Sequence, residues 1–303
     1  MQSLAGFAMR GRSQAALAAA GSAVLSLVLP LVALISSAVV ALATLRQGPR
    51  EGALVMGIAG LGSAGLAWLA LGAPWPAVGF LLVLWVPLWG LALTLRATGS
   101  LALVVQAAAL LGLLILVGIY AVTEDPAAQW AKLMEPLRAG LVEGEVFSEV
   151  DSQVLVETLA KWMTGAFAAS LYAQFLLALF IGRWWQAVLY NPGGFGSEFR
   201  ELRLSPVLGL LALALLVLRW LRPEAVWIFD LLVLLLPLFL LQGLAVAHGL
   251  RAILGAGVGW LIALYVLLVL AMPYAEGLVC ALGLADLGLD LRRRFARRLP
   301  EAP

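Results

Sequence analysis

The sequence predicts an all-α, polytopic integral membrane protein: a helical bundle of about eight to ten transmembrane helices with one extracytoplasmic amphipathic segment. Of its 303 residues, 63% are hydrophobic and only 12% are charged, whereas about 25% of the residues in a soluble domain are charged. The apolar residues form continuous runs rather than the alternating pattern of a membrane β-barrel. This composition excludes a soluble enzyme, a disordered chain and a disulfide-stapled secreted domain.

Ten apolar runs approach or reach the length of about 20 residues that a helix needs to cross a bilayer. They are 14–29, 31–45, 52–71, 77–95, 101–122, 161–182, 205–221, 226–247, 252–271 and 273–289. The first two runs meet at Pro30 and the last two at Pro273. Each of these pairs is therefore either two helices or one helix kinked at the proline.

Charge placement predicts the orientation. If the N-terminus is cytoplasmic, most of the 19 Lys and Arg residues lie on the cytoplasmic side, as the positive-inside rule requires. The exceptions are Lys132, Arg138, Lys161, Arg219 and Arg222. We therefore expect a multi-pass protein of the bacterial inner membrane with both termini in the cytoplasm. We also expect that the apolar run after Arg10 and Arg12 is not a cleaved signal peptide.

The chain divides by composition into four regions. Residues 1–122 are the N-terminal transmembrane helices, and 123–160 are an acidic extracytoplasmic segment. Residues 161–291 are the C-terminal transmembrane helices, which include a cytoplasmic loop at 183–204, and 292–303 are a basic cytoplasmic tail.

The acidic segment contains an amphipathic helix. Asp125-Pro126 is typical of a helix start, Ser148 and Asp151 indicate a capping box that opens the next helix, and Pro136 should kink the helix between them. One apolar stripe follows at helical spacing, at Trp130, Met134, Leu137 and Leu141. The stripe fits either a helix lying on the outer leaflet or a lid over an outward-facing pocket.

Small residues at a spacing of four predict close helix packing. Two such ladders, Gly165-Ala169-Ala173 and Gly255-Gly259-Ala263, are expected to pack within the chain. A third, which includes Ala16 and Ala20, is either an internal contact or a docking face for another membrane subunit.

The sequence offers no constellation for catalysis. It has one Cys and one His, fewer ligands than a structural zinc site or an iron–sulfur cluster needs. It contains no His-Glu-x-x-His motif and no P-loop. We therefore expect no enzyme activity, no metal and no cofactor, and any ATPase that drives the protein must be a separate chain.

Polar residues inside apolar runs are costly in a bilayer and tend to face a cavity or another helix. The candidates for a substrate pocket are Asp230, Glu276, Gln174 and Gln242. The alternative for each is a helix–helix hydrogen bond or a side chain that reaches the membrane surface. A proton-coupled carrier that uses Asp230 or Glu276 is a further, less favoured hypothesis.

The loop at 183–204 contains a dense glycine cluster. Asn191-Pro192-Gly193-Gly194 is a strong turn signal, and Trp184 and Trp185 resemble interfacial anchors. The loop is either a tight structured turn or a contact surface for a partner. The candidate contact residues are Trp184, Trp185, Asn191, Gly193, Gly194 and Phe195.

The residues from Arg183-Trp184-Trp185-Gln186 to Asn191-Pro192-Gly193-Gly194-Phe195-Gly196, followed by Glu198-Phe199-Arg200, resemble the signature of the YybS-like family of uncharacterised bacterial membrane proteins, in its proteobacterial branch. That family is distantly similar to the substrate-binding S components of energy-coupling-factor importers. The resemblance implies a small-molecule binding or transport subunit that depends on a separate ATPase, with Ala16 and Ala20 docking on a membrane coupling subunit. Substrate would enter from outside, under the helix at 126–142. The alternative is a non-transporting scaffold that acts through residues 183–203 and its basic tail on a soluble partner or membrane lipid; neither hypothesis involves nucleic acid.

Overall fold

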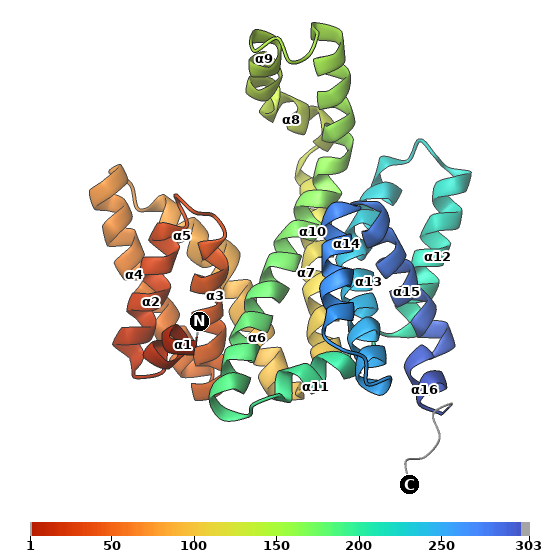
Figure 1. The fold of residues 1–303 in the computed structure, drawn as a ribbon. Helices are drawn as coiled ribbons and strands as arrows, with labels where there is room; N and C mark the ends of the chain where they lie inside the picture. The colour runs from red at the N-terminus through yellow and green to blue at the C-terminus, as the bar shows by residue number, and fades with distance from the viewer. Residues whose placement is uncertain (1, 298–303) are drawn as a thin grey trace. The chain divides into compact units, whose positions relative to one another are not determined.

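The structure is a computed structural model that describes residues 2–297, and these residues form helices and short connections without a strand (Figure 1). The predicted all-α fold is therefore confirmed. Arg298 and the rest of the predicted basic tail, through residue 303, lie outside the described residues.

The helices group into two compact units. Unit 1 comprises Met1–Ala108 and Ala173–Leu202, and unit 2 comprises Ala109–Tyr172 and Arg203–Pro303. This grouping differs from the division by composition, because the acidic segment 123–160 belongs with the C-terminal helices and residues 173–202 belong with the N-terminal ones. The regions defined by composition are continuous in the sequence, whereas the two units group helices that pack together even when they are far apart in the sequence.

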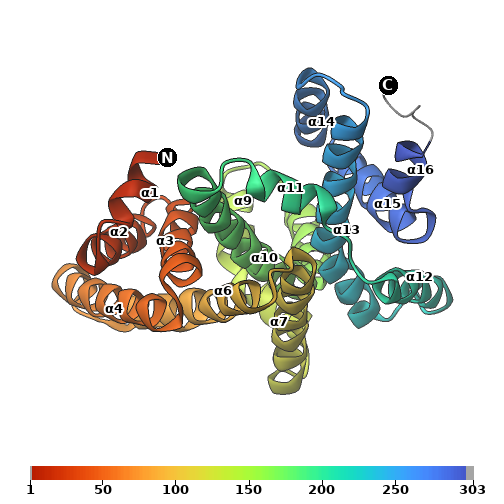
Figure 2. The same cartoon turned by 90° about the horizontal axis from the view of Figure 1, so that it is seen from below.

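Unit 1 is built around short, alanine-rich helices. Its elements are α1 Gln2–Ala8, α2 Arg12–Leu25, α3 Val32–Gln47, α4 Pro49–Leu71, α5 Trp75–Phe80, the π-helical turn η1 Leu81–Trp85, α6 Val86–Thr98, the first part of α7 Leu101–Val122, the last part of α10 Glu149–Tyr190, and α11 Gly194–Glu201. Helices α2, α3 and α4 lie side by side (Figure 2). The hydroxyl of Ser36 on α3 donates a hydrogen bond of 2.7 Å to the carbonyl oxygen of Ala19 on α2, which small side chains permit by letting the two backbones approach.

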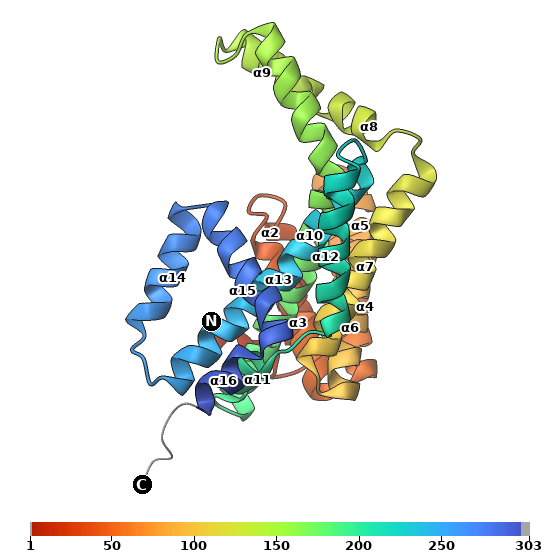
Figure 3. The same ribbon diagram turned by 90° about the vertical axis from the view of Figure 1, so that its right-hand side faces the viewer.

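Unit 2 contains the remaining parts of α7 and α10 with seven further helices of the described chain. These are α8 Pro126–Leu133, α9 Glu135–Glu143, α12 Pro206–Leu221, α13 Val226–Ile253, α14 Gly259–Leu270, α15 Tyr274–Leu289 and α16 Leu291–Ala296. Within this unit α8 and α9 lie at one end and α16 at the opposite end (Figures 1 and 3).

Close packing of α13 on α15 depends on two glycines. A Cβ atom on Gly243 would collide with the carbonyl oxygen of Val279, and one on Gly283 would collide with the carbonyl oxygen of Phe239. The ladder predicted at Gly255 and Gly259 is wrong, because a Cβ on either residue would meet nothing within 4 Å. Gly255 instead lies in the turn after α13 with φ +63°, a conformation that favours glycine.

Five helical segments among residues 2–297 are long and apolar enough to cross a membrane, or six if the bent pair α11 and α12 counts as one span. They are Pro49–Ala70, Trp75–Thr98, Leu101–Val122, Glu149–Tyr190 and Val226–Ile253. The other predicted runs also form helices, but each of these helices has fewer than 18 residues and is shorter than a full membrane span. Pro30 and Pro273 lie in turns between separate helices, so neither pair is a single kinked helix.

Large apolar side chains remain exposed along several of these helices. On α12 they include Leu210, Val217 and Trp220, and α14 buries only Leu261. Contiguous exposed apolar surface is unfavourable in water and suits the hydrocarbon of a bilayer. The fold is therefore that of a multi-pass membrane protein whose helices contact lipid.

Candidate functional site

The acidic segment folds as two short helices rather than one kinked helix. At the start of α8, Asp125 accepts a hydrogen bond of 3.0 Å from the backbone N–H of Ala128, and Pro126 occupies the first turn. The helix stops at Leu133, and α9 starts with Glu135 and Pro136. The predicted start at Asp125-Pro126 is confirmed, and the break falls just before Pro136, whose ring is accepted in a first turn but not inside a helix.

One half of the predicted capping box at the start of α10, the bond to the Ser148 hydroxyl, is confirmed. The backbone N–H of Asp151 donates a hydrogen bond of 3.1 Å to the Ser148 hydroxyl, which in turn donates one of 2.7 Å to the Asp151 carboxylate. The Ser148 hydroxyl thus satisfies one of the free backbone N–H groups at the start of α10.

A cavity lies between α8, α9 and the first turns of α10, and we call it the α8–α10 cavity. Its volume is about 650 Å³, within the range of about 300–1,000 Å³ that is typical of small-molecule sites. Its lining residues are Ala131, Lys132, Glu135, Arg138, Glu149, Val150, Gln153, Val156 and Glu157. The lining carries both positive and negative charge, so it is suited to a hydrophilic solute rather than an apolar one.

The two cations of the α8–α10 cavity differ in their partners. Arg138 forms an ion pair of 2.6 Å with Glu135 one turn away, and its hydrogen bond and charge hold the pKa of Glu135 below its ordinary value. Lys132 lies within 4.0 Å of no carboxylate oxygen among residues 2–297. Lys132 is therefore the cation that is available to an anionic group in the cavity.

Trp130 attaches α8 to α10. Its indole N–H donates a hydrogen bond of 3.0 Å to the hydroxyl of Thr164, and its ring lies 5.6 Å from that of Phe167. The rest of the predicted apolar stripe does not enter a core, since Leu137 is half exposed and α9 buries no residue. Trp130 is therefore the aromatic anchor that attaches α8 to α10 beside the α8–α10 cavity.

Asp230 is fully buried next to this anchor. Its Oδ1 atom accepts a hydrogen bond of 2.9 Å from the backbone N–H of Gly165, and its Oδ2 atom accepts one of 2.6 Å from the Tyr120 hydroxyl. Both carboxylate oxygens thus join α13 to α10 and α7. The structure places Asp230 in a helix contact rather than in a substrate pocket.

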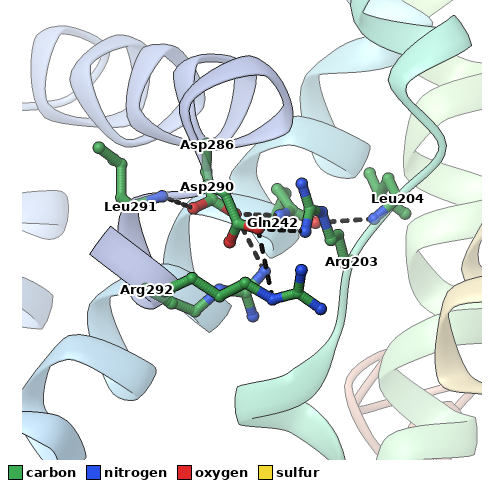
Figure 4. A network of polar contacts seen from close by, with 8 residues as sticks. Arg203, Leu204, Gln242, Asp286, Asp290, Leu291 and Arg292 are labelled. Carbon is green, nitrogen blue, oxygen red and sulfur yellow. Dashed lines mark hydrogen bonds and ion pairs between the residues drawn. The ribbon is translucent and has the colours of Figure 1, made fainter. Parts of the chain in front are cut away.

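Gln242 is part of a buried polar network at the other end of unit 2 (Figure 4). Its side-chain oxygen accepts a hydrogen bond of 3.0 Å from the backbone N–H of Leu204, and its side-chain N–H donates one of 2.9 Å to Asp286. The Asp286 carboxylate also accepts hydrogen bonds of 2.9 Å from the backbone N–H of Leu291 and from the Arg292 guanidinium. Gln242 therefore binds protein groups at both ends of its amide.

A second acidic residue, Asp290, extends this network at its exposed edge. It forms ion pairs of 2.7 Å with Arg203 and 3.5 Å with Arg293. Burial raises its pKa, but the hydrogen bond and charge of Arg203 outweigh this effect and hold the pKa of Asp290 below its ordinary value. The network joins the start of α12 to α13, α15 and α16, the helix that opens the basic tail.

Two of the four residues predicted to form a substrate pocket, Asp230 and Gln242, do not come together. Asp230 and Gln242 lie twelve positions apart on α13, about 18 Å along a helix, with separate partners. Gln174 belongs to unit 1, whereas Glu276 lies in the first turn of α15 in unit 2. None of the four lines the α8–α10 cavity. The two buried members of the set, Asp230 and Gln242, bind protein groups of neighbouring helices, as polar groups buried in an apolar bundle often do.

The predicted loop at 183–204 is mostly helical. Helix α10 continues to Tyr190, Asn191–Gly193 form the turn, and α11 follows. Gly193 has φ +86°, as the turn signal predicts. Gly194 packs against the side chain of Asn191, with no room for a Cβ atom.

Side chains of this segment hold it against α10 within unit 1. Arg183 forms an ion pair with Glu198 and donates a hydrogen bond of 2.9 Å to Gln186. The ring of Phe195 lies 5.7 Å from that of Phe180. Of the two tryptophans, Trp185 is 1% exposed and Trp184 is 41% exposed, so only Trp184 presents a large surface to a partner.

Ala16 and Ala20 are buried in the core of unit 1, where α2 packs on α3 and α4. The face predicted as a docking site is therefore filled by the chain's own helices. Small side chains allow α2 to approach a neighbouring helix closely. They do not determine whether that neighbour belongs to this chain or to another subunit.

Three contacts in these networks were not anticipated from the sequence. Tyr120 and Thr164 each supply one hydroxyl to a contact between helices, and a polar group near the end of an apolar run is the only signal that each offers. The contribution of Leu204 comes from its backbone N–H, which no side-chain pattern reveals.

Comparison of the chain with family models, with curated proteins and with solved structures gave no match.

Proposed function

We propose that this chain is a solute-binding subunit of a transport system in the bacterial inner membrane, similar in role to the S components of energy-coupling-factor importers. The observation that carries the proposal is the α8–α10 cavity, with a volume of about 650 Å³ and a lining of both charges. The YybS-like sequence motif and the acidic character of residues 123–160 support it. In the proposed orientation both termini are cytoplasmic, so the cavity faces the other side of the membrane.

The chemistry of the lining indicates the class of solute. Lys132 offers a positive charge for an anionic group, while Glu149 and Glu157 offer negative charge for a cationic one. A small zwitterion carries both. The cavity contains acids and a base but no paired arrangement that would activate a nucleophile, so we propose binding rather than catalysis.

Energy for transport comes from a second protein in this proposal. The 303 residues contain no Gly-x-x-x-x-Gly-Lys-Ser/Thr motif, and such a motif is what cradles nucleotide phosphates in a P-loop ATPase. A coupling subunit must therefore join this chain to an ATPase. Because Ala16 and Ala20 are buried, that subunit would have to contact a different surface.

The test is solute binding by the purified protein. A panel of small zwitterions, anions and cations is added, and the melting temperature is measured for the unaltered chain and for two variants, Lys132→Gln and Lys161→Gln. These are the two lysines of the sequence, and Lys161 does not line the α8–α10 cavity. We expect a stabilising solute whose effect is lost in Lys132→Gln and kept in Lys161→Gln.

Two results would contradict this proposal. One is a panel without any stabilising solute, combined with purification from membranes without an associated ATPase. The other is a solute effect that Lys132→Gln and Lys161→Gln reduce equally, since a general charge effect requires no cavity.

The alternative function is a non-transporting scaffold that recruits a partner through residues 183–203. The exposed indole of Trp184 and the exposed turn at Asn191 favour it. Trp184→Ala is the appropriate variant, because substitution of Gly193 or Gly194 would disturb the turn itself. Loss of a co-purifying protein in Trp184→Ala, with the melting temperature unchanged, would support the scaffold.

A further inference from the structure

A second cavity in unit 2 lies beside α10, between the end of α12 and the start of α13, and we call it the interfacial cavity. Its volume is about 520 Å³. Residues from α10, from the end of α12 and from the start of α13 line it: Lys161, Trp162, Arg219, Pro223, Glu224, Val226 and Phe229.

The position of this cavity coincides with the ends of three predicted membrane spans. Lys161 begins the apolar run 161–182, Arg219 is close to the end of the run 205–221, and Val226 begins the run 226–247. In a bilayer the ends of such runs lie at the level of the lipid headgroups. The interfacial cavity is therefore placed at the boundary between hydrocarbon and water.

The cavity has an excess of positive charge. Neither Lys161 nor Arg219 lies within 4.0 Å of a carboxylate oxygen among residues 2–297. The one carboxylate of the lining belongs to Glu224, which is 3.9 Å from Arg222, outside the cavity. Two cations thus face the space with little compensation.

Aromatic and backbone contacts hold Arg219 in position. The rings of Trp162 and Phe229 lie 5.3 Å apart, and the Arg219 guanidinium lies 5.8 Å above the ring of Phe229. Arg219 also donates a hydrogen bond to the carbonyl oxygen of Pro223. These contacts leave further guanidinium N–H groups for an acceptor, since arginine has five donors.

Exposed apolar side chains surround the site. Trp162 is 53% exposed, Trp220 is 81% exposed and Trp227 is 49% exposed. Tryptophan is enriched where a protein meets the headgroup region, and the outward face of α12 beside it would accept acyl chains. A soluble anion would use the cations but not this apolar surface.

We propose that the interfacial cavity binds the phosphate headgroup of an anionic phospholipid, with Lys161 and Arg219 as its ligands. A phosphodiester carries one negative charge, and both side chains donate charge-assisted hydrogen bonds to such oxygens. The lipid's acyl chains lie along the apolar face of α12. The proposal is independent of any solute in the α8–α10 cavity.

The chain provides a matched control for the test. Arg219 and Arg222 lie three positions apart at the end of α12, but only Arg219 lines the cavity, whereas the Arg222 side chain is 70% exposed. Arg219→Gln and Arg222→Gln remove the same charge, and Lys161→Gln removes the other proposed ligand from an exposed position.

The experiment measures lipid binding to the purified protein in detergent micelles. Phosphatidylglycerol, phosphatidylcholine or inorganic phosphate is titrated, and binding is followed by native mass spectrometry and by the melting temperature. We expect preferential binding of phosphatidylglycerol to the unaltered chain. Arg219→Gln and Lys161→Gln should each weaken it about fivefold, because one basic residue near an anionic lipid surface contributes roughly that factor, and Arg222→Gln should leave it unchanged.

Three outcomes would overturn the proposal. Equal binding of phosphatidylglycerol and phosphatidylcholine would remove the role of charge. Equal weakening by Arg219→Gln and Arg222→Gln would show a diffuse surface effect instead of a site. Stabilisation by inorganic phosphate as strong as that by the lipid would assign the two cations to a soluble anion. If Arg219→Gln does not fold, Lys161→Gln alone decides, and unchanged lipid binding in that variant contradicts the proposal.

Discussion

The backbone N–H of Gly165 donates a hydrogen bond to Oδ1 of Asp230 over 2.9 Å, and this contact joins α10 to α13 where their backbones nearly touch. A Cβ atom on Gly165 would lie 2.7 Å from the Cα atom of Asp230. The packing ladder predicted at Gly165 and the charged group predicted at Asp230 are thus two sides of one helix contact. Removal of either residue should loosen unit 2 rather than abolish a substrate site.

Gly165→Ala should therefore destabilise the protein. The added methyl group collides with the backbone and side chain of Asp230, and overpacking of this kind typically costs about 1–3 kcal/mol. Gly118→Ala on α7 is the control, because a Cβ atom there meets nothing within 4 Å. The melting temperature in detergent is the measurement, and equal values for the two variants would contradict a tight contact at Gly165.

Asp286→Ala should cost more stability than Asp290→Ala. Asp286 is fully buried and has three partners, so its loss leaves Arg292 without its buried carboxylate and Gln242 without an acceptor. Breaking a buried ion pair from one side typically costs about 3–5 kcal/mol. Asp290 lies at the exposed edge of the same network, and its pairs are expected to contribute less. A larger loss of melting temperature in Asp290→Ala would show that the buried part is not the stabilising one.

The contribution of Asp290 should depend on pH. Because the pKa of Asp290 is lower in the folded protein than in the unfolded chain, its charge stabilises the fold above the ordinary aspartate pKa of about 3.9. This contribution is lost as the pH falls through the lowered value. We expect the difference in melting temperature between the unaltered chain and Asp290→Asn to be constant from about pH 5 to pH 8 and to shrink below about pH 4. A difference that grows in acid would have the wrong sign.

Substitution by alanine should change the stability of the protein differently at two buried serines of unit 1. The Ser36 hydroxyl donates to the carbonyl oxygen of Ala19, so Ser36→Ala should cost about 1 kcal/mol. The Ser63 hydroxyl is buried without a hydrogen-bond partner among the described residues, so Ser63→Ala removes an unsatisfied polar group and should be neutral or stabilising. Thermal unfolding of the two variants compares them directly. Equal destabilisation would indicate that Ser63 has a partner after all.

Local signals in the sequence predicted local structure well. Asp125, Ser148 and Gly193 act over one helical turn, and the structure shows the helix start, the Ser148 cap and the positive φ that they predicted. Hydrophobicity predicted where the helices lie, although turns shorten several of them. The reason is that caps and turns depend on neighbouring residues, which the sequence presents directly.

Contacts between helices were predictable only in part. The sequence indicated that Gly165 packs closely but not that Asp230 is its partner, and it gave equal weight to Gly255, which packs on nothing. It did not distinguish a polar group that faces a solute from one that faces another helix, so Asp230 and Gln242 were placed in a pocket that does not form. Nor did it reveal that Ala16 and Ala20 are already covered.

The sequence by itself determined that this is an all-α membrane protein, where its helices lie and how several of them begin. Only the tertiary structure decided which helices pair, which polar side chains satisfy one another, and that charged side chains from α8, α9 and α10 surround a cavity. The physical reason is that apolar composition and hydrogen bonds within a helix are local properties. In hydrocarbon all apolar helix faces are nearly equivalent, so pairing depends on the fit between surfaces that are far apart in the chain.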